Sequence, residues 1–150
     1  MTDKYKHIKH IKDTHMQRKI TSHVINSANE KLTVTVMDEP GSGGANHLYK
    51  IKGFNSASNP SDPWTNKYRK PATHSMILFQ NGPINEVGTN GLTHEVLLAI
   101  IADRLQGFQA GPYACDANRD ALYYVECAIR ELHKRTIERR HRGVEGTHTV

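Results

Sequence analysis

The sequence predicts an α+β fold, in which an N-terminal antiparallel β-sheet is followed by a C-terminal two-helix hairpin. Two observations carry this prediction. In the first half, apolar and polar residues alternate, as in "KLTVTVMD" and "HLYKIKGF", which is the period of half-buried strands. From about residue 92, apolar residues recur every three or four positions, which is the period of helices that bury one face.

The composition fits one small, basic, globular domain. The chain has 150 residues, of which 37% are hydrophobic and 23% charged, with a net charge of +5 and a pI near 9.3. A positive net charge favours anionic partners, such as phosphates or nucleic acid. Two cysteines without an apolar signal sequence indicate a reducing cytosol rather than a disulfide scaffold. No apolar run is long enough to span a membrane, so we expect no membrane partner.

The first half of the chain is expected to hold four strands. Residues 1–16 are polar and basic, and we expect a mobile arm or a short helix there. The region 17–91 is expected to form the sheet, with a long exposed loop over residues 55–74, where three prolines lie among polar residues. The predicted strands are "RKITSHVI", "KLTVTVMD", "HLYKIKGF" and "HSMILFQ", and the last is the most apolar and is therefore expected to be the most buried.

The region 92–142 is expected to form the helical hairpin, with a tail at residues 143–150. Thr93 is the predicted N-cap of the first helix, which Gly107, Gly111 and Pro112 are expected to end. The second helix is expected to begin at Asp116 or Asn118 and to run to about Arg140. The predicted buried stripes are Leu97, Ile100, Ile101, Leu105 and Phe108 on the first helix, and Ala121, Val125, Ala128 and Leu132 on the second, with Leu122 and Ile129 flanking.

The connection between the helices, "GFQAGPYACDAN", is more specific than a helix connection needs. Phe108 offers a stacking surface, and the amide of Gln109 can bond a base edge or a ribose. Asn118 lies near the start of the second helix, where free N–H groups favour an anion. We therefore treat this segment as a candidate ligand site. The alternative is that Phe108 is a core residue and Asn118 only a helix cap.

The polar ends of the second helix suggest a second site. Arg135 and Arg139 are four residues apart, so both project from one face just after Leu132. A guanidinium matches phosphate with a two-pronged donor set, although the pair can also be a solvated helix end. Asn118 and Arg139 would lie about 30 Å apart, because an α-helix rises 1.5 Å per residue. One small ligand on one chain cannot touch both, so we expect two sites or contributions from several chains.

Apolar side chains off the main stripes favour self-association; they are Val96, Ala99, Tyr123 and Tyr124.

Other patterns are weaker. "PGSGG" lacks the lysine–serine pair of a P-loop and is better explained as a turn between strands. His7, His10 and His15 lack further metal ligands at suitable spacing. No nucleophile, base and orienting group occur in a recognisable set, so we expect a binding protein with no catalytic residues, metal or cofactor.

Four segments of the chain carry a family resemblance: "GGANHLYKI", "ILFQNGPINEVGTNGLTHEVLLAIIADRL", "GFQAGPYACDAN" and "ERRHRGVEGTHTV". They resemble the bacteriophage anti-Thoeris sponge proteins, which sequester the cyclic ADP-ribose isomers made by immune TIR-domain enzymes. The similarity covers about residues 17–150, with the 55–74 loop as an insertion. The helical hairpin also resembles the phage anti-CBASS sponge, which captures cyclic oligonucleotides.

The resemblance implies a non-enzymatic sponge in the cytoplasm of an infected bacterial host. It implies a dimer that can assemble into a hexamer, as a trimer of dimers. A glycocyclic ADP-ribose isomer would bind at the dimer interface, and cyclic dinucleotides or trinucleotides would bind at Arg135 and Arg139. Asp116–Ala117 departs from relatives that carry an arginine and a glutamate, which puts phosphate affinity there in doubt. The residues implied for the ADP-ribose site are Phe108, Gln109, Asn118 and Arg104.

Two other functions remain open. The first is a small basic phage protein that binds nucleic acid through residues 1–16 and the Arg130–Arg142 segment. The second is an enzyme that degrades the same cyclic nucleotides. A sponge returns its ligand intact on heating, a hydrolase returns a changed product, and a nucleic-acid binder loses affinity steeply as salt rises.

Overall fold

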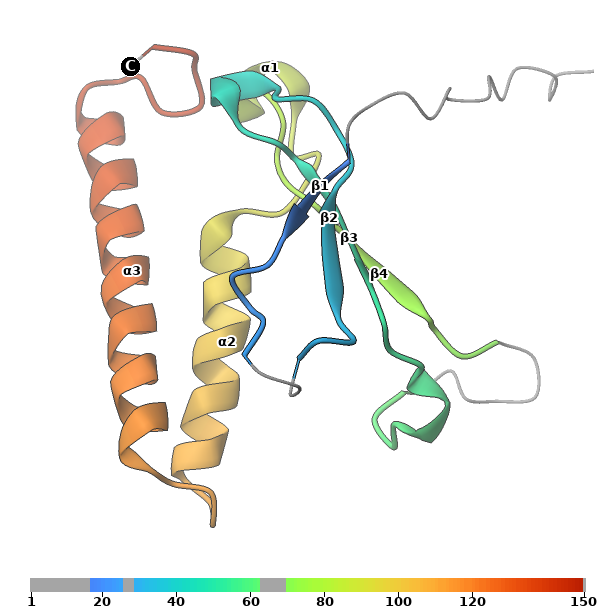
Figure 1. Cartoon of the computed structure of the whole chain (residues 1–150). Coiled ribbons are helices and arrows are strands. Elements are labelled where there is room, and N and C mark those ends of the chain that lie inside the picture. The colour runs from blue at the N-terminus through green and yellow to red at the C-terminus, as the bar shows by residue number, and fades with distance from the viewer. Residues whose placement is uncertain (1–16, 26–28, 63–69, 150) are drawn as a thin grey trace, which may run out of the picture. The chain divides into compact units, whose positions relative to one another are not determined.

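The computed structural model describes residues 17–25, 29–62 and 70–149, and it confirms the α+β fold (Figure 1). Four short strands form one sheet in the order β1-β2-β3-β4, and helices follow in the C-terminal half. The predicted arm at residues 1–16 lies outside the described residues. The strands are β1 (Arg18–Ile20), β2 (Thr33–Val36), β3 (Leu48–Lys52) and β4 (His74–Leu78).

Antiparallel pairing with alternating side chains explains the first three strands. Val34 lies opposite Ile20 on β1 and opposite Ile51 on β3, so β-branched side chains meet across the sheet. Val36 is the buried hydrophobic residue of this sheet. The first strand is shorter than predicted, because the Val24 N–H bonds the Thr21 carbonyl and turns the chain.

The expected burial of the fourth strand is wrong. The β4 side chains Met76 and Leu78 are 45% and 50% exposed. β4 is an edge strand of the sheet, and an apolar strand becomes buried only where another layer covers it. The 55–74 loop is not entirely exposed either. It contains a 3₁₀ turn, η2 (Ser56–Ser58), in which Ser56 is buried and bonds Ala72 through both its N–H and its hydroxyl.

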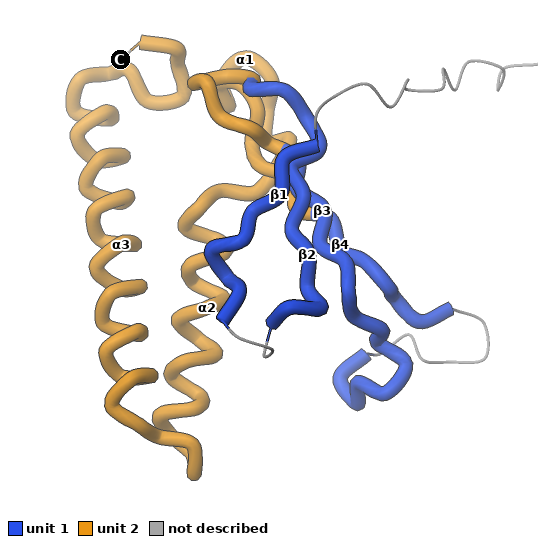
Figure 2. Tube along the Cα trace, viewed as in Figure 1, with its two compact units in different colours: residues 1–40, 48–76 blue, residues 41–47, 77–150 orange. Residues whose placement is uncertain are grey.

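The chain divides into two compact units (Figure 2). The first comprises residues 1–40 and 48–76, and it holds β1, β2 and β3. The second comprises residues 41–47 and 77–150, and it holds the helices together with the 3₁₀ turn η1 (Ser42–Gly44). β4 runs from the first unit into the second. All of the predicted site residues belong to the second unit.

Two long antiparallel helices dominate the second unit, α2 (His94–Gln109) and α3 (Asp116–His141). Thr93 caps α2 as predicted, since its hydroxyl accepts the Val96 N–H at 3.4 Å. Gly107 does not end α2, which continues to Gln109 because the Ala110 N–H still reaches the Gln106 carbonyl. The residue that caps α3 is Cys115 and not Asn118, whose N–H bonds the Cys115 sulfur at 3.5 Å.

The two helices face each other through stripes that only partly match the predicted ones. Gln106 bonds Glu126 near one end and Glu95 faces Arg135 near the other, as the antiparallel arrangement requires. Several expected core residues lie outside these stripes, because each helix carries apolar residues on more than one face and only one face can meet the partner. The less exposed positions are Glu95, Leu97, Leu98, Ala102, Leu105 and Gln109 on α2, and Asn118, Leu122, Val125, Glu126, Cys127, Ile129, Leu132, Thr136 and Arg139 on α3. The expected core residues that prove exposed are Ile100, Ile101, Phe108, Ala121 and Ala128.

A short helix, α1 (Ile84–Val87), precedes α2 and is absent from the sequence-based expectations. Gln80 ties its flanks together by donating to the carbonyls of Gly82 and Gly88. Asn81 and Asn90 exchange hydrogen bonds beside it. Among the described helices, none is both long and apolar enough to cross a membrane.

Candidate functional site

An aromatic cluster lies at the end of the hairpin where α2 passes into α3. Phe108, in the last turn of α2, is 40% exposed. Tyr113 meets its ring edge-on at a centroid distance of 6.4 Å, and the Arg104 guanidinium carbon lies 5.6 Å from the ring centre. An exposed ring beside a guanidinium can stack on a base while the cation faces a phosphate.

Gln109 and Asn118 hold the connection between the helices. The Gln109 Oε1 accepts the Cys115 N–H at 2.9 Å, and the Asn118 Nδ2 donates to the Tyr113 carbonyl at 3.3 Å. Each amide therefore uses one of its two polar ends within the connection. Toward the residues that the structure describes, Gln109 Nε2 and Asn118 Oδ1 make no hydrogen bond, so a donor and an acceptor are left for a ligand.

These contacts join four predicted site residues into one group, which we call the loop-end cluster. Arg104 touches Phe108, Phe108 touches Tyr113, and Tyr113 receives the Asn118 amide. Gln109 joins through Cys115. Sequence reasoning missed the part played by Tyr113, although an aromatic residue after a Gly–Pro pair was the available signal. The loop-end cluster comprises Arg104, Phe108, Gln109, Tyr113 and Asn118.

The charged side chains at the start of α3 pair with one another. Asp116, in the first turn, binds Arg119 at 2.7 Å, and Asp120 binds the same arginine at 3.0 Å. The aspartate that departs from the resembled family therefore has a guanidinium partner one turn later. All three side chains are largely exposed, so these ion pairs add little to stability.

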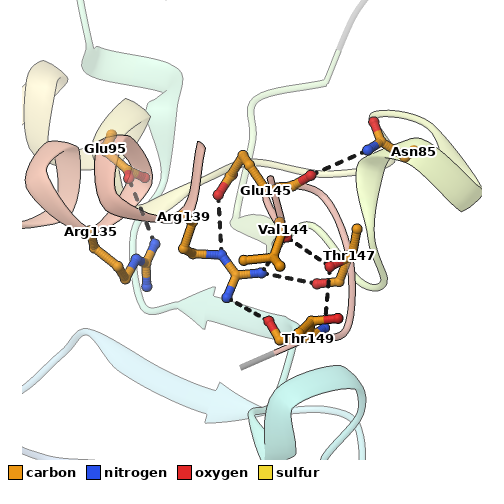
Figure 3. Close-up of polar contacts among 8 residues, drawn as sticks. All are labelled: Asn85, Glu95, Arg135, Arg139, Val144, Glu145, Thr147 and Thr149. Carbon is orange, nitrogen blue, oxygen red and sulfur yellow. Dashed lines mark hydrogen bonds and ion pairs between the residues drawn. The ribbon is translucent and has the colours of Figure 1, made fainter. Parts of the chain in front are cut away.

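The two predicted arginines near the other end of α3 have different surroundings (Figure 3). The Arg135 side chain is 58% exposed, and its carboxylate partner Glu95 lies 3.9 Å away. The Arg139 side chain is 23% exposed and ion-paired to Glu145 at 3.1 Å. Arg139 also donates to three backbone carbonyls, of Val144, Thr147 and Thr149. The structure therefore places the pair together on α3 but binds only one of them into the fold.

A cavity of about 450 Å³ opens beside Arg135. His94 lies at its wall, with its ring 5.3 Å from that of Phe79. The walls are mostly apolar and Arg135 supplies a cation, a combination that suits a ligand with a flat apolar part and an anionic group. Sequence reasoning did not identify this cavity, because its residues come from separate segments. The lining residues are Phe79, His94, Leu97, Leu98, Leu132 and Arg135.

Other sequence patterns give no site. The "PGSGG" segment forms η1 and its flanks, in which the Ser42 N–H bonds Asn81 and the Gly44 N–H bonds the Gly41 carbonyl. Those amides are used in a turn, as expected. Over residues 17–25, 29–62 and 70–149, no group of three potential metal ligands occurs. The histidines His7, His10 and His15 lie outside the described residues.

The hairpin thus presents two separate sets of candidate ligand-binding groups, one at each end of α3. Asn118 and Arg139 belong to the same helix, about 30 Å apart at 1.5 Å per residue. Stacking rings, half-used amides and guanidinium groups are features of a protein that binds anionic aromatic ligands.

The chain is similar to Thoeris anti-defense 1 of Bacillus phage SBSphiJ7. The two sequences are 49% identical over 74 residues, which are 49% of this chain and 52% of the relative. The chain thus spans about half the length of the curated relative that it matches. No family model matches the chain.

Proposed function

We propose that this protein acts against the Thoeris defence of bacteria by binding a cyclic ADP-ribose isomer and keeping it from its receptor. Two observations support the proposal: the similarity to a phage protein named for Thoeris anti-defence, and the chemistry of the loop-end cluster. Of these, the cluster carries the ligand assignment. Phe108 stacks on the adenine, Arg104 faces the diphosphate, and the unused amide atoms of Gln109 and Asn118 bond ribose or base.

The proposed action is sequestration without chemistry, in the cytoplasm of an infected host. The loop-end cluster combines an arginine, aromatic rings and amides, which suit binding. Asp116, which follows the connection between the helices, is already paired with Arg119. The ligand should therefore return unchanged. Incubation with a glycocyclic ADP-ribose isomer, removal of free ligand, heating and mass analysis test this directly. Recovery of a linear or cleaved product would instead support the enzyme alternative.

We further propose that the protein is a homo-oligomer, at least a dimer and in full a hexamer built as a trimer of dimers. Large apolar side chains along both helices remain exposed in the single chain, and apolar surface of this kind marks interaction sites. The exposure is on α2 and on α3, so more than one contact surface is available. The residues are Val96, Ile100 and Ile101 on α2, and Tyr123, Tyr124 and Ile137 on α3.

A second candidate ligand is a cyclic oligonucleotide bound at the arginine end. The observation that favours it is the cavity beside Arg135, whose apolar walls suit a base and whose guanidinium suits a phosphate. The same panel assay tests it with cyclic dinucleotides and trinucleotides. Binding of long DNA or RNA, with affinity that falls steeply with salt, would support the nucleic-acid alternative.

A further inference from the structure

The Arg139 side chain makes several hydrogen bonds at the C-terminal end of α3. Its Nε donates to the Glu145 carboxylate at 3.1 Å, and its Nη1 donates to the Thr149 carbonyl at 2.9 Å. Its Nη2 donates to the carbonyls of Val144 and Thr147, both at 3.0 Å. A guanidinium has five N–H donors. Four acceptors therefore occupy most of its hydrogen-bonding capacity.

The acceptors come from residues 143–149, which we call the C-terminal loop. The loop also carries its own bonds: the Thr147 hydroxyl donates to the Val144 carbonyl at 2.7 Å, and the Thr149 N–H donates to that hydroxyl at 3.2 Å. Figure 3 shows the loop curled around the Arg139 guanidinium, with Arg135 outside it. Three backbone carbonyls converge on one side chain, so Arg139 organises the loop.

The loop is also fixed to α1. Asn85 Nδ2 donates to the Glu145 carbonyl at 3.2 Å. Gly146 has a φ of +74°, and a Cβ there would come within 2.8 Å of the Asn85 Nδ2. Only glycine satisfies both the backbone conformation and the close approach. The loop therefore has one defined position, anchored by Arg139 on one side and by Asn85 on the other.

Arg135 contrasts with this arrangement. It lies four residues earlier on α3, a rise of about 6 Å. Its side chain is more than twice as exposed as that of Arg139, and it lines the 450 Å³ cavity. Its carboxylate partner is 3.9 Å away, a contact that an incoming phosphate can replace at small cost. To bind the same phosphate with a two-pronged donor set, Arg139 would first have to give up some of its four hydrogen bonds.

We propose that the two arginines have different roles: Arg135 is the anion contact of the arginine end, and Arg139 is a positioning residue that builds the C-terminal loop beside it. This inference rests on the proposed cyclic oligonucleotide site and assigns different roles there to the two arginines. A ligand at Arg135 then meets a preformed loop, and the loop places backbone groups, rather than a second guanidinium, next to the ligand.

A double-mutant cycle separates the two roles. Arg139→Ala and Gly146→Ala each disrupt the loop, the first by removing its anchor and the second by the clash with Asn85. Gly44→Ala is the matched control, because Gly44 has the same φ of +74° but no atom within 4 Å of the added Cβ. The measurements are affinity for cyclic tri-adenylate by calorimetry and amide hydrogen exchange over residues 143–149.

We expect each loop variant to speed exchange in the loop and to weaken cyclic tri-adenylate binding by about 10-fold, and Gly44→Ala to do neither. The Arg139→Ala/Gly146→Ala double variant should bind no more weakly than the single variant with the lower affinity, since both changes act through the same loop. Arg135→Ala should weaken binding by 10-fold or more and leave loop exchange unchanged. Losses that multiply in the double variant would show a direct phosphate contact by Arg139 and overturn the inference.

Loop exchange that is unchanged in Arg139→Ala would also overturn it. If the wild-type protein does not bind cyclic tri-adenylate, the role given to Arg135 is wrong, and hydrogen exchange still decides the role of Arg139. Neither result bears on the loop-end cluster, because calorimetry with a cyclic ADP-ribose isomer tests that site on the same variants. Failure of this inference is therefore distinguishable from failure of the proposed main function.

Discussion

The Asn118 side chain bonds the backbone carbonyl of Tyr113 at 3.3 Å, so the third residue of α3 holds the connection that precedes the helix. The bond uses the amide nitrogen and leaves the amide oxygen directed elsewhere. Asn118 therefore has two tasks in the proposed site, to fix Tyr113 and to offer an acceptor to the ligand.

Asn118→Asp tests these two tasks without changing how the side chain packs. The carboxylate keeps the shape of the side chain, but it cannot donate to Tyr113 and it adds a negative charge near a diphosphate. We expect a loss of at least 10-fold in affinity for the cyclic ADP-ribose isomer by calorimetry. The melting temperature should change little, because an exposed hydrogen bond contributes about 1 kcal/mol. Unchanged affinity would remove Asn118 from the site.

Phe108→Ala should remove the stacking surface. Base–aromatic stacking is worth about 1–3 kcal/mol, which corresponds to a 5- to 150-fold loss of affinity. Phe108→Tyr should retain most of the binding. Ile137→Ala is a suitable control, because Ile137 is an exposed large side chain near the other end of α3. Equal losses in Phe108→Ala and Ile137→Ala would indicate an effect on assembly rather than on stacking.

Arg135→Lys and Arg139→Lys should behave differently, although both keep the charge. A lysine at position 135 still attracts a phosphate, so cyclic tri-adenylate binding should fall by less than 10-fold. A lysine at position 139 cannot present the planar fork that now reaches four acceptors, so the loop should exchange as fast as in Arg139→Ala. If a lysine at position 139 preserves slow exchange in the C-terminal loop, the positioning role of Arg139 is contradicted.

Ile100→Asp should reduce the oligomer to a smaller species. Ile100 is 55% exposed in the single chain, and a buried unpaired carboxylate in an interface is costly. Light scattering at micromolar concentration should then give a lower mass than the wild type, with the helical circular dichroism retained. A wild-type protein that is already monomeric would contradict the proposed assembly.

Thr93→Ala should destabilise the hairpin by about 1 kcal/mol, because it removes the hydroxyl that caps α2. Thr93→Ser keeps the hydroxyl and should restore the stability. Denaturant unfolding of the three proteins measures the difference. Equal stability of Thr93→Ala and the wild type would mean that the 3.4 Å bond to Val96 contributes nothing in solution.

The sequence by itself determined the parts of this protein that depend on local chemistry. The change of period from two to between three and four separates the sheet from the hairpin, and Thr93 marks the start of α2. The loop-end residues could be proposed because they are close in sequence. Phe108, Gln109 and Asn118 span eleven residues, so a single turn of chain brings them together.

Only the tertiary structure decided which faces are covered and which charges are free. The sequence pattern placed Ile101 inside and made Arg135 and Arg139 equivalent. In the structure Leu98 and Ala102 are covered instead of Ile101, and Arg139 bonds the C-terminal loop. The cavity beside Arg135 likewise joins Phe79 to helices that begin later in the chain. Periodicity shows that a side chain lies on a face, but burial and hydrogen bonding depend on what other segments bring to that face.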